Sequence, residues 1–325
     1  MAAKRMRKRP RSRRPWYVIA IALVLAFLGW YAGGDFRLED LIAQDLPDSS
    51  AQQAAAPLQA EGETLVYYLD VGQGDSELIQ LSNGKNILID AGTRSTAEEL
   101  VSYLQNLGVQ KIDYLIATHP HEDHIGGMTD VVQNFEIGSI YMPKIADSQI
   151  PTTKVYENLL TAIDEKGLSI TAAQAGSVIF EEAGARMEIL APNSQEYSDL
   201  NSYSIVTKLT VGEKAFLFTG DAEADSEEEM LDLGYSVDAD VLKLGHHGSS
   251  TSNSMAFLEA VSPQAAIVSC GAGNDYGHPH QEVMDRLAQL NVTVYRTDTQ
   301  GSILARCDGS SITFETDLPS VGGEQ

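Results

Sequence analysis

The chain has 325 residues and a formal net charge of −24 at pH 7. Eight of its 22 basic residues lie between Lys4 and Arg14, so residues 15–325 carry 14 basic against 46 acidic side chains, a balance of −32. So acidic a surface repels polyanions unless metals or a local basic patch offset it, which excludes a nucleic-acid binder with a generally basic face. About 260 residues follow the N-terminal segment, enough for one large domain or two fused halves.

The N-terminal sequence predicts a membrane anchor. A basic segment, residues 1–15, runs into an apolar stretch, residues 16–34, with Trp-Tyr pairs near both of its ends. That stretch is just long enough to cross a bilayer, which takes about 17–25 residues. The basic residues and the aromatic belts predict a cytoplasmic N-terminus, a single transmembrane helix and an extracellular domain. A cleaved signal peptide, which would release a secreted domain, is the alternative.

Residues 35–60 are rich in Ala, Gln, Asp, Ser and Pro, which predicts a flexible linker that holds the domain off the membrane. The domain itself is assigned to residues 61–317, and residues 318–325 are expected to form a frayed tail. Two cysteines, Cys270 and Cys307, lie in apolar contexts outside any metal-ligand spacing. They are interpreted as buried thiols or as one disulfide, which an exported location permits.

Short strands alternate with helices along the domain, which predicts an α/β fold with a sheet buried between helices. Apolar, β-branched runs predict strands at residues 64–70, 77–81, 86–89, 112–117, 204–211, 215–219 and 241–244. Helices are expected at residues 95–107, 155–166, 225–233 and 279–290. Ser95 and Glu98 are interpreted as a capping box that begins the first helix, and Gly108 is expected to end it.

All seven histidines fall in three short clusters. The first, in THPHEDHIGG, follows the predicted buried strand 112–117 and offers four metal donors within six residues, His119, His121, Asp123 and His124. A divalent metal needs such imidazole nitrogens and carboxylates to converge at roughly 2.0–2.2 Å. A solvent-exposed polar loop is the alternative, and four donors at this spacing disfavour it.

Five motifs in a fixed order resemble the metallo-β-lactamase-fold hydrolases: LDVGQGDSELI (69–79), ILIDAG (87–92), THPHEDHIGG (118–127), FLFTGDAE (216–223) and DVLKLGHHGSS (240–250). The resemblance is strongest to the ComEC-like branch, similar to the hydrolase domain of the competence DNA-uptake channel, and extends to surface phosphorylcholine esterases. It covers about residues 65–314. It implies a four-layer αββα sandwich with the site on one edge and with two divalent metal ions, Zn²⁺ or Mn²⁺.

The donors of the first cluster are expected to divide between two metals, because they alternate along a strand-to-loop segment. His119 and His121 would reach one metal, and Asp123 and His124 would face the second. Asp221, which on its own would be interpreted as an ordinary turn residue, would bridge both through its two oxygens. Asp123 and Asp221 are therefore the candidate catalytic carboxylates.

The second cluster, LGHHGS, would complete the second metal site. His246 is the first choice as ligand from the matching motif, and the spacing cannot separate it from His247. The histidine that remains unbound would hydrogen-bond substrate. Many relatives supply a further metal histidine between the first cluster and Asp221, but this chain has none there. Asn201 and Ser202 stand at the corresponding place, and Asn201 is expected to coordinate weakly or through water.

Further residues are expected beside the ligands. Asp90, which ends ILIDAG, resembles an aspartate that orients a ligand histidine, although an acid that merely ends a strand is nearly as good an interpretation. His278 and His280 of YGHPH precede a predicted helix and would suit a phosphate, or else pack as a capped turn on the rim. Lys243 would point toward the same site, or lie as a lysine at the edge of the core.

Three functions are compatible with these motifs. Hydrolysis of phosphodiesters, on DNA or on a cell-surface phosphodiester, by a water held between two metals is the leading hypothesis. Hydrolysis of an acyl substrate, such as a lactone, thioester or β-lactam, is the second. A catalytically silent metal-binding surface module is the third, disfavoured because a structural zinc site is closed by four ligands. The sequence does not indicate an oligomeric state.

Overall fold

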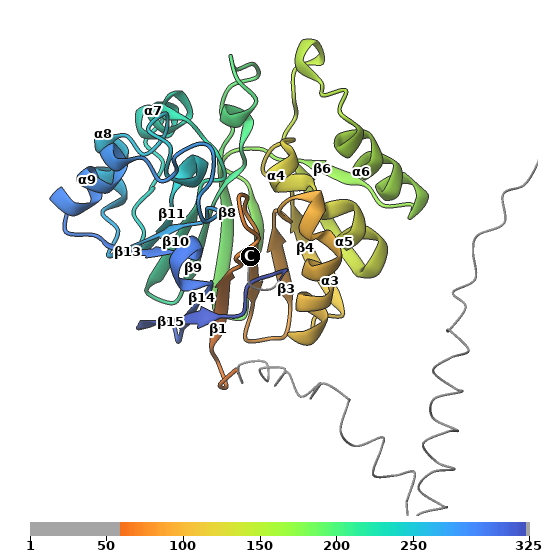
Figure 1. Ribbon diagram of the computed structural model, residues 1–325, viewed down its shortest axis with the longest axis horizontal. Helices are drawn as coiled ribbons and strands as arrows, with labels where there is room; N and C mark the ends of the chain where they lie inside the picture. The colour runs from red at the N-terminus through yellow and green to blue at the C-terminus, as the bar shows by residue number, and fades with distance from the viewer. Residues whose placement is uncertain (1–58, 323–325) are drawn as a thin grey trace, which may run out of the picture. The chain divides into compact units, whose positions relative to one another are not determined.

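The computed structural model describes residues 59–322 (Figure 1). The basic segment and the membrane helix expected from the sequence, and residues 35–58 of the expected linker, lie outside the described residues. Within residues 59–322, no helix combines the length and the apolar character needed to span a bilayer.

Two sheets form the centre of the described region. The first has the strand order β15-β14-β1-β2-β3-β4-β5-β6. Its strands are β1 (Thr64–Tyr68), β2 (Glu77–Gln80), β3 (Asn86–Ile89), β4 (Lys111–Ile116), β5 (Glu136–Met142), β6 (Ile170–Ala172), β14 (Ser302–Cys307) and β15 (Ile312–Leu318). The second has the order β13-β12-β11-β10-β9-β8-β7. Its strands are β7 (Val178–Glu182), β8 (Ala185–Ala191), β9 (Val206–Val211), β10 (Lys214–Phe218), β11 (Val241–Lys243), β12 (Ala265–Val268) and β13 (Thr293–Arg296).

Helices cover the outer face of each sheet (Figure 1). On the first sheet lie α3 (Ala97–Asn106), α5 (Met128–Asn134) and α6 (Lys154–Glu165), and on the second lie α7 (Ala224–Asp232), α8 (Met255–Val261) and α9 (Gln281–Gln289). Two one-turn helices, α4 (Glu122–Ile125) and α10 (Thr297–Gln300), and four 3-10 turns, Arg94–Thr96, Asp147–Gln149, Asn201–Tyr203 and Gly245–Gly248, complete the described elements. The two-sheet α/β architecture expected from the sequence is confirmed.

Strand β1 shows why the sheets stack. Its five residues are all buried, as in a strand covered on both faces. Leu65 and Tyr67 pack among residues of α3, α5 and α6, whereas Val66 and Tyr68 pack toward the second sheet. The Tyr68 ring stacks on Phe218 of β10, with ring centroids 6.0 Å apart. The period-two alternation of one short segment thus contributes to two separate cores.

The direction of the strands brings the sequence motifs to one edge. Strands β3, β4 and β5 run parallel in the first sheet, and β10, β11, β12 and β13 run parallel in the second. Polar loops follow the carboxyl ends of β3, β4, β10 and β11, where parallel strands expose ligand-binding loops. These loops hold Asp90, the first histidine cluster, Asp221 and the second histidine cluster.

Two local expectations differ from the structure. The capping box is wrong: α3 begins after Thr96 without a side-chain cap, because the Ser95 hydroxyl bonds to the Thr93 hydroxyl instead, 2.7 Å away. The expected frayed tail is packed as far as the description reaches. Val321 is 2% exposed, and its N–H donates to the Asp70 carbonyl at 2.8 Å.

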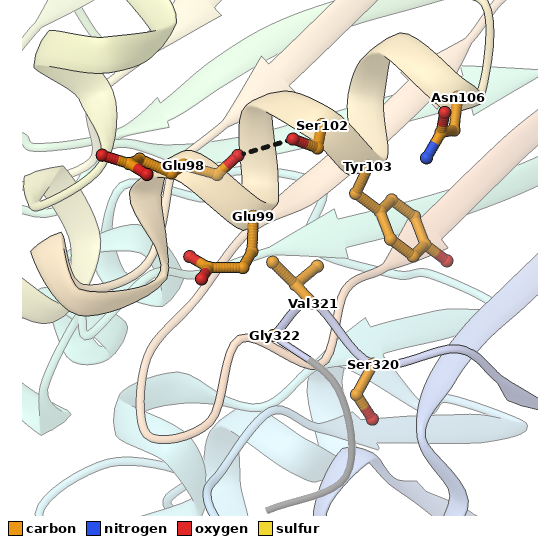
Figure 2. A pocket seen from close by; sticks show the side chains of 8 residues that line it. All are labelled: Glu98, Glu99, Ser102, Tyr103, Asn106, Ser320, Val321 and Gly322. Carbon is orange, nitrogen blue, oxygen red and sulfur yellow. Dashed lines mark hydrogen bonds between the residues drawn. The ribbon is translucent and has the colours of Figure 1, made fainter. Parts of the chain in front are cut away.

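Figure 2 shows this C-terminal segment beside α3, where a shallow cavity of about 340 Å³ is lined by Glu98, Glu99, Tyr103 and Val321 among others. The cavity has no histidine or cysteine in its lining, so it offers no donor set for a transition metal. Both cysteines are buried and free, which confirms the interpretation as thiols over the disulfide.

Candidate metal centre

The loop after β4 carries the first histidine cluster, whose last donors, Asp123 and His124, lie on the one-turn helix α4. In α4 the Ile125 N–H donates to the His121 carbonyl at 3.0 Å. His119 Nε2 and His121 Nδ1 lie 3.1 Å apart. Two nitrogen ligands of a tetrahedral ion stand about 3.4 Å apart, given metal–nitrogen bonds of about 2.1 Å. These two imidazoles can therefore face one cation.

The glycine-rich DVGQGD loop packs directly against this cluster. Gly74 lies so close that a Cβ placed on it would be 2.4 Å from the Asp123 carbonyl oxygen. The next residue, Asp75, donates its N–H to that same carbonyl at 3.1 Å. The absence of a side chain at Gly74 thus lets two loops approach and fixes the backbone of Asp123.

Asp90 lies directly behind His124, fully buried. One carboxylate oxygen accepts from the Thr118 N–H at 2.8 Å, and the other lies 2.7 Å from His124 Nδ1. This contact places the proton on Nδ1 and leaves His124 Nε2 as a free donor atom. Asp90 has a φ of 55°, a strained conformation for an aspartate that this bonding network holds in place.

Asp221 occupies the centre of the histidines. Its Oδ2 lies 3.2 Å from Nε2 of His124, 3.7 Å from those of His119 and His247, and 3.8 Å from that of His246. The carboxylate is 2% exposed, so no bulk water screens it. A single carboxylate surrounded by four imidazole nitrogens has the geometry expected of a bridging ligand between two cations.

The second cluster distinguishes its two histidines. His247 is 1% exposed and directs Nε2 toward Asp123 Oδ2, 3.3 Å away, while its Nδ1 bonds to the Ser269 carbonyl at 2.9 Å. His246 is 24% exposed on its side chain, and its Nδ1 lies 3.1 Å from the Thr251 hydroxyl. Asp123, His124, Asp221 and His247 form one group whose donor atoms all lie within 4.8 Å of one another. The geometry therefore favours His247 over the first choice from sequence, His246, as ligand of the second metal.

The other predicted residues divide between the cavity and its surroundings. Lys243 does not line the cavity: it is 1% exposed, and its Nζ pairs with Asp75 Oδ2 at 2.6 Å. His278 does line it and packs parallel to His247, with ring centroids 6.0 Å apart. His280 lies behind the rim, where its Nδ1 accepts from the Ser250 N–H at 3.0 Å. The structure thus places His278, but neither His280 nor Lys243, where a substrate would lie.

A cavity of about 510 Å³ opens over the metal centre. It is lined by Gln73, Thr93, His121, Glu122, Asp123, Asn201, Asp221, His246, His247, Tyr276 and His278. None of these lining residues is Lys or Arg. Tyr276 is 67% exposed and stacks on His278 at the rim, with ring planes 19° apart. Negative charge bound here would be met by cations at the floor of the cavity rather than by basic side chains.

The electrostatics of the protein groups favour bound cations. Burial lowers the pKa of His247, but the Asp221 and Asp75 carboxylates outweigh it and raise that pKa to about 10. Burial also lowers the pKa of His124, but the Asp221 and Asp90 carboxylates outweigh this effect and raise that pKa well above its usual range. The carboxylates thus bind positive charge strongly, as protons or as metal ions. Burial and the neighbouring imidazoles lower the pKa of His278 to about 4, which keeps this ring neutral.

Unpaired buried atoms show that the donor set fits metal ions. His124 Nε2, Asp221 Oδ1 and Asn201 Oδ1 are buried and lack a hydrogen-bond partner among the described residues. A buried polar atom without a partner is costly, so native structures satisfy such atoms with protein, water or ions. Imidazole nitrogen and carboxylate oxygen are ordinary ligands of Zn²⁺ and Mn²⁺. The residues present therefore fit two divalent cations.

Some residues of the site were missed by the sequence interpretation. Ser204 accepts the Asp221 N–H at 3.0 Å and lies 3.2 Å from His119 Nδ1. Glu223 accepts from the Asn201 amide at 3.2 Å and lies 3.4 Å from His246 Nδ1. Glu223 lies two residues after Asp221 in the quoted TGDAE motif, which was the available signal. Ser204 gave no such signal, because its role depends on a tertiary contact.

The chain belongs to the metallo-β-lactamase superfamily, whose family model matches residues 69–272. Among solved structures of this fold, a CmlA β-hydroxylase E377D mutant superposes with a TM-score of 0.51 over 75% of this chain and 54% of the other, at 14% identity. That similarity concerns the fold alone.

Within the superfamily, three curated relatives are ComEC-like competence proteins, which confirms the ComEC-like branch. ComE operon protein 3 of Bacillus subtilis (strain 168) is 32% identical over 81% of this chain and 35% of its own length. Recombination protein 2 of Haemophilus influenzae (strain ATCC 51907 / DSM 11121 / KW20 / Rd) is 36% identical over 72% of this chain and 28% of its own. The chain therefore spans only about a third of the relatives that it matches.

Proposed function

We propose that this metal-dependent hydrolase of the metallo-β-lactamase superfamily cleaves phosphodiesters. The observation that carries the proposal is Asp221 Oδ2 at the centre of four imidazole nitrogens, 3.2 to 3.8 Å away, beneath an open cavity. Two divalent cations bound there would supply an activated water and would stabilise charge on the attacked and departing oxygens. A phosphoryl centre, with its several anionic oxygens, suits such a paired site.

The protein groups divide the remaining work. His119 and His121 would hold one cation, and Asp123, His124 and His247 the other, with Asp221 between them. Asp90 keeps the His124 proton on Nδ1, and the Ser269 carbonyl keeps the His247 proton on its Nδ1. Both rings therefore offer Nε2 to a cation without having to change tautomer, so little reorganisation precedes the reaction.

His246 and His278 are placed to contact the substrate. Both line the cavity, and their rings meet edge to face with centroids 5.5 Å apart. His278 is neutral, because its pKa is lowered to about 4, so it would hydrogen-bond a phosphate oxygen rather than pair with it as a cation. His246 Nε2 lies 3.8 Å from Asp221 Oδ2 and would reach the departing oxygen, to which a positioned imidazole can deliver a proton.

The charge distribution favours short substrates over long duplex DNA. The cavity lining contains no Lys or Arg, and residues 15–325 carry a large acidic excess. Proteins that bind duplex DNA neutralise several phosphates with basic side chains. A single phosphodiester, or one exposed in a single strand, can instead be bound by the metal centre alone.

The test uses the domain Glu61–Gln325, loaded with Mn²⁺ or Zn²⁺ or stripped with EDTA, on bis-p-nitrophenyl phosphate, single-stranded DNA and duplex DNA. Metal-dependent turnover of the small diester that is lost in a His119→Ala/Asp221→Ala variant is the expected result. Hydrolysis of a lactone or a thioester without any phosphodiester cleavage would favour an acyl hydrolase. Two bound cations with no turnover of either class would favour a silent module.

We also propose that residues 16–34 anchor the domain outside the cell membrane, with residues 1–15 in the cytoplasm. The support is the sequence pattern alone, a basic segment followed by an apolar stretch flanked by aromatic residues. The full chain should fractionate with membranes, and added protease should digest the domain in intact spheroplasts. Recovery of a shortened chain in the medium would favour the cleaved signal peptide instead.

A further inference from the structure

Between His124 and Asp221 the chain has no histidine that could add a third imidazole to His119 and His121. The segment that approaches these two residues is the 3-10 turn Asn201–Tyr203. The Ile205 N–H donates to the Thr118 carbonyl at 3.0 Å, and the Ser204 hydroxyl lies 3.2 Å from His119 Nδ1. These contacts fix the turn against the first histidine loop. Asn201, the first residue of the turn, thereby reaches the cavity wall.

The orientation of the Asn201 amide follows from its partner. Asn201 is 6% exposed and lines the cavity, and its Nδ2 donates to Glu223 Oε1 at 3.2 Å. An ionised carboxylate accepts hydrogen bonds and donates none, so the amide nitrogen, not the oxygen, must face Glu223. The Oδ1 atom therefore points away from Glu223, and it is buried with no hydrogen-bond partner among residues 59–322.

We propose that Asn201 Oδ1 is a protein ligand of the first cation, together with His119, His121 and Asp221, and that Glu223 positions the amide for this role. A neutral carbonyl oxygen is a harder ligand than an imidazole nitrogen, in the sense of hard and soft ligands. Carbonyl and carboxylate ligands suit Mn²⁺ and Mg²⁺, whereas imidazole suits Zn²⁺. The first position accordingly prefers Mn²⁺ over Zn²⁺ more than a three-histidine site would.

The backbone and the side chain of Asn201 have separate roles. The backbone of Asn201 donates to Asp199 Oδ1 at 2.8 Å and accepts from the Ser204 N–H at 2.9 Å. Neither bond needs the amide side chain, so substitution leaves the turn with its backbone bonds. The neighbouring Ser202 is also buried, but its hydroxyl bonds to Asp225 and it does not line the cavity. Ser202→Ala is therefore a matched control.

The experiment measures metal binding and does not depend on turnover. Metal-free Glu61–Gln325 and its variants are titrated with Mn²⁺ and with Zn²⁺ by calorimetry, and the bound metal is counted by elemental analysis. The unaltered domain should bind two Mn²⁺, and Ser202→Ala should match it. Asn201→Ala should weaken one site for Mn²⁺ by at least about 10-fold, since even the loss of a residue that only supports a ligand costs about 10- to 100-fold.

Two substitutions separate ligation from packing. Asn201→His restores an imidazole and should shift the preference of one site toward Zn²⁺ by about tenfold or more, which a packing role would not do. In Glu223→Gln the new amide can donate to Asn201 Oδ1, so the Asn201 side chain is no longer held in one orientation. This variant should weaken the same Mn²⁺ site less than Asn201→Ala does. If Asn201→Ala fails to fold, the Asn201→His titration decides alone.

Unchanged Mn²⁺ affinity in Asn201→Ala, an unchanged metal preference in Asn201→His, or a single Mn²⁺ in the unaltered domain would each overturn the proposal. The proposal depends on the metal centre assumed in the proposed function but not on its reaction. Loss of one site in Asn201→Ala, in a domain that cleaves no phosphodiester, would support this ligand and contradict only the proposed reaction.

Discussion

The two histidine loops reach the same cavity with opposite backbone conformations. In the loop after β4, every residue from His119 to His124 has an ordinary negative φ, and the loop ends in the one-turn helix α4. In the loop after β11, His246 and His247 are consecutive left-handed residues, with φ of 50° and 54°. Such a conformation costs roughly 1–2 kcal/mol per residue, so the surrounding structure must hold it.

Different supports hold the two loops. Behind the first stands the Asp90 carboxylate, bonded to Thr118 and His124. Behind the second stands the Asn253 amide, which bonds to both the N–H and the carbonyl of Gly245 and to the Ser249 carbonyl, at 2.9 to 3.2 Å. The comparison teaches that ligands on a relaxed backbone need orientation, whereas ligands on a strained backbone need their loop held in shape.

The largest effect is expected at Asp221, which both loops share. Asp221→Ala should leave the four imidazoles without their common carboxylate, remove both cations and lower kcat/KM by at least about 10³-fold, since metal stabilisation is worth several kcal/mol. Metal content and bis-p-nitrophenyl phosphate kinetics measure this. Glu228→Ala on the exposed face of α7 is the control. Retention of two cations by Asp221→Ala would show that the loops bind metal independently.

The two adjacent histidines should separate next. His247→Ala should lose one cation, because His247 Nε2 faces Asp123 and Asp221 from a buried position. His246→Ala should keep both cations and lower kcat/KM by about 10²-fold, the usual contribution of one acid–base group. Elemental analysis of both purified variants decides. The reverse pattern would return the ligand role to His246, the first choice from sequence.

A smaller effect is expected from the support of the first loop. Asp90→Asn keeps the shape of the side chain, but an amide cannot accept hydrogen bonds from both Thr118 and His124 as the carboxylate does. Metal affinity should fall by about 10- to 100-fold, as is typical when the partner of a ligand histidine is lost. Competition with a chelating dye measures the affinity. Asp113→Asn, whose carboxylate accepts from the Asn86 N–H at the far end of β4, should leave it unchanged.

The support of the second loop should affect the stability of the fold rather than metal affinity. Asn253→Ala leaves three backbone groups of Gly245 and Ser249 without partners and should lower the free energy of unfolding by about 2–3 kcal/mol. Urea denaturation of the metal-free domain measures it. Asn291→Ala, at an exposed left-handed residue with a φ of 57°, isolates the cost of the backbone conformation alone. Equal losses in the two variants would mean that the Asn253 side-chain bonds contribute nothing.

The sequence predicted most of what depends on local pattern. The strands Asn86–Ile89 and Val241–Lys243 lie where the apolar runs indicated, and the helix predicted at residues 225–233 is α7 within a residue at each end. The donors of the first cluster lie in the loop that follows β4, as the predicted buried strand before them indicated. Strand β14 was not predicted, because its pairing with β1 depends on contacts across more than half of the chain, and β15, which pairs with β14, was not predicted either.

Which histidine of the second cluster is directed toward the metal centre could not be predicted, for a similar reason. Two adjacent histidines in a regular strand or helix point in different directions, but here both line the cavity, and which one approaches Asp123 depends on the left-handed turn at His246 and His247. Positive φ at histidine is uncommon, and no glycine stands at either position to signal it. For Lys243, of the two interpretations from sequence, the structure favours the lysine at the core, since its charge is paired there by Asp75, 168 residues away along the chain.

The position of β1 has a consequence for how the domain can be made. This strand, near the start of the described residues, lies between β2 and β14, and Thr64 is paired with Cys307. Until the chain has been synthesised beyond β14, one edge of an entirely buried apolar strand has no partner, and open edges of this kind recruit other chains. A nascent or truncated polypeptide ending before Ser302 should therefore aggregate, however complete its metal ligands are.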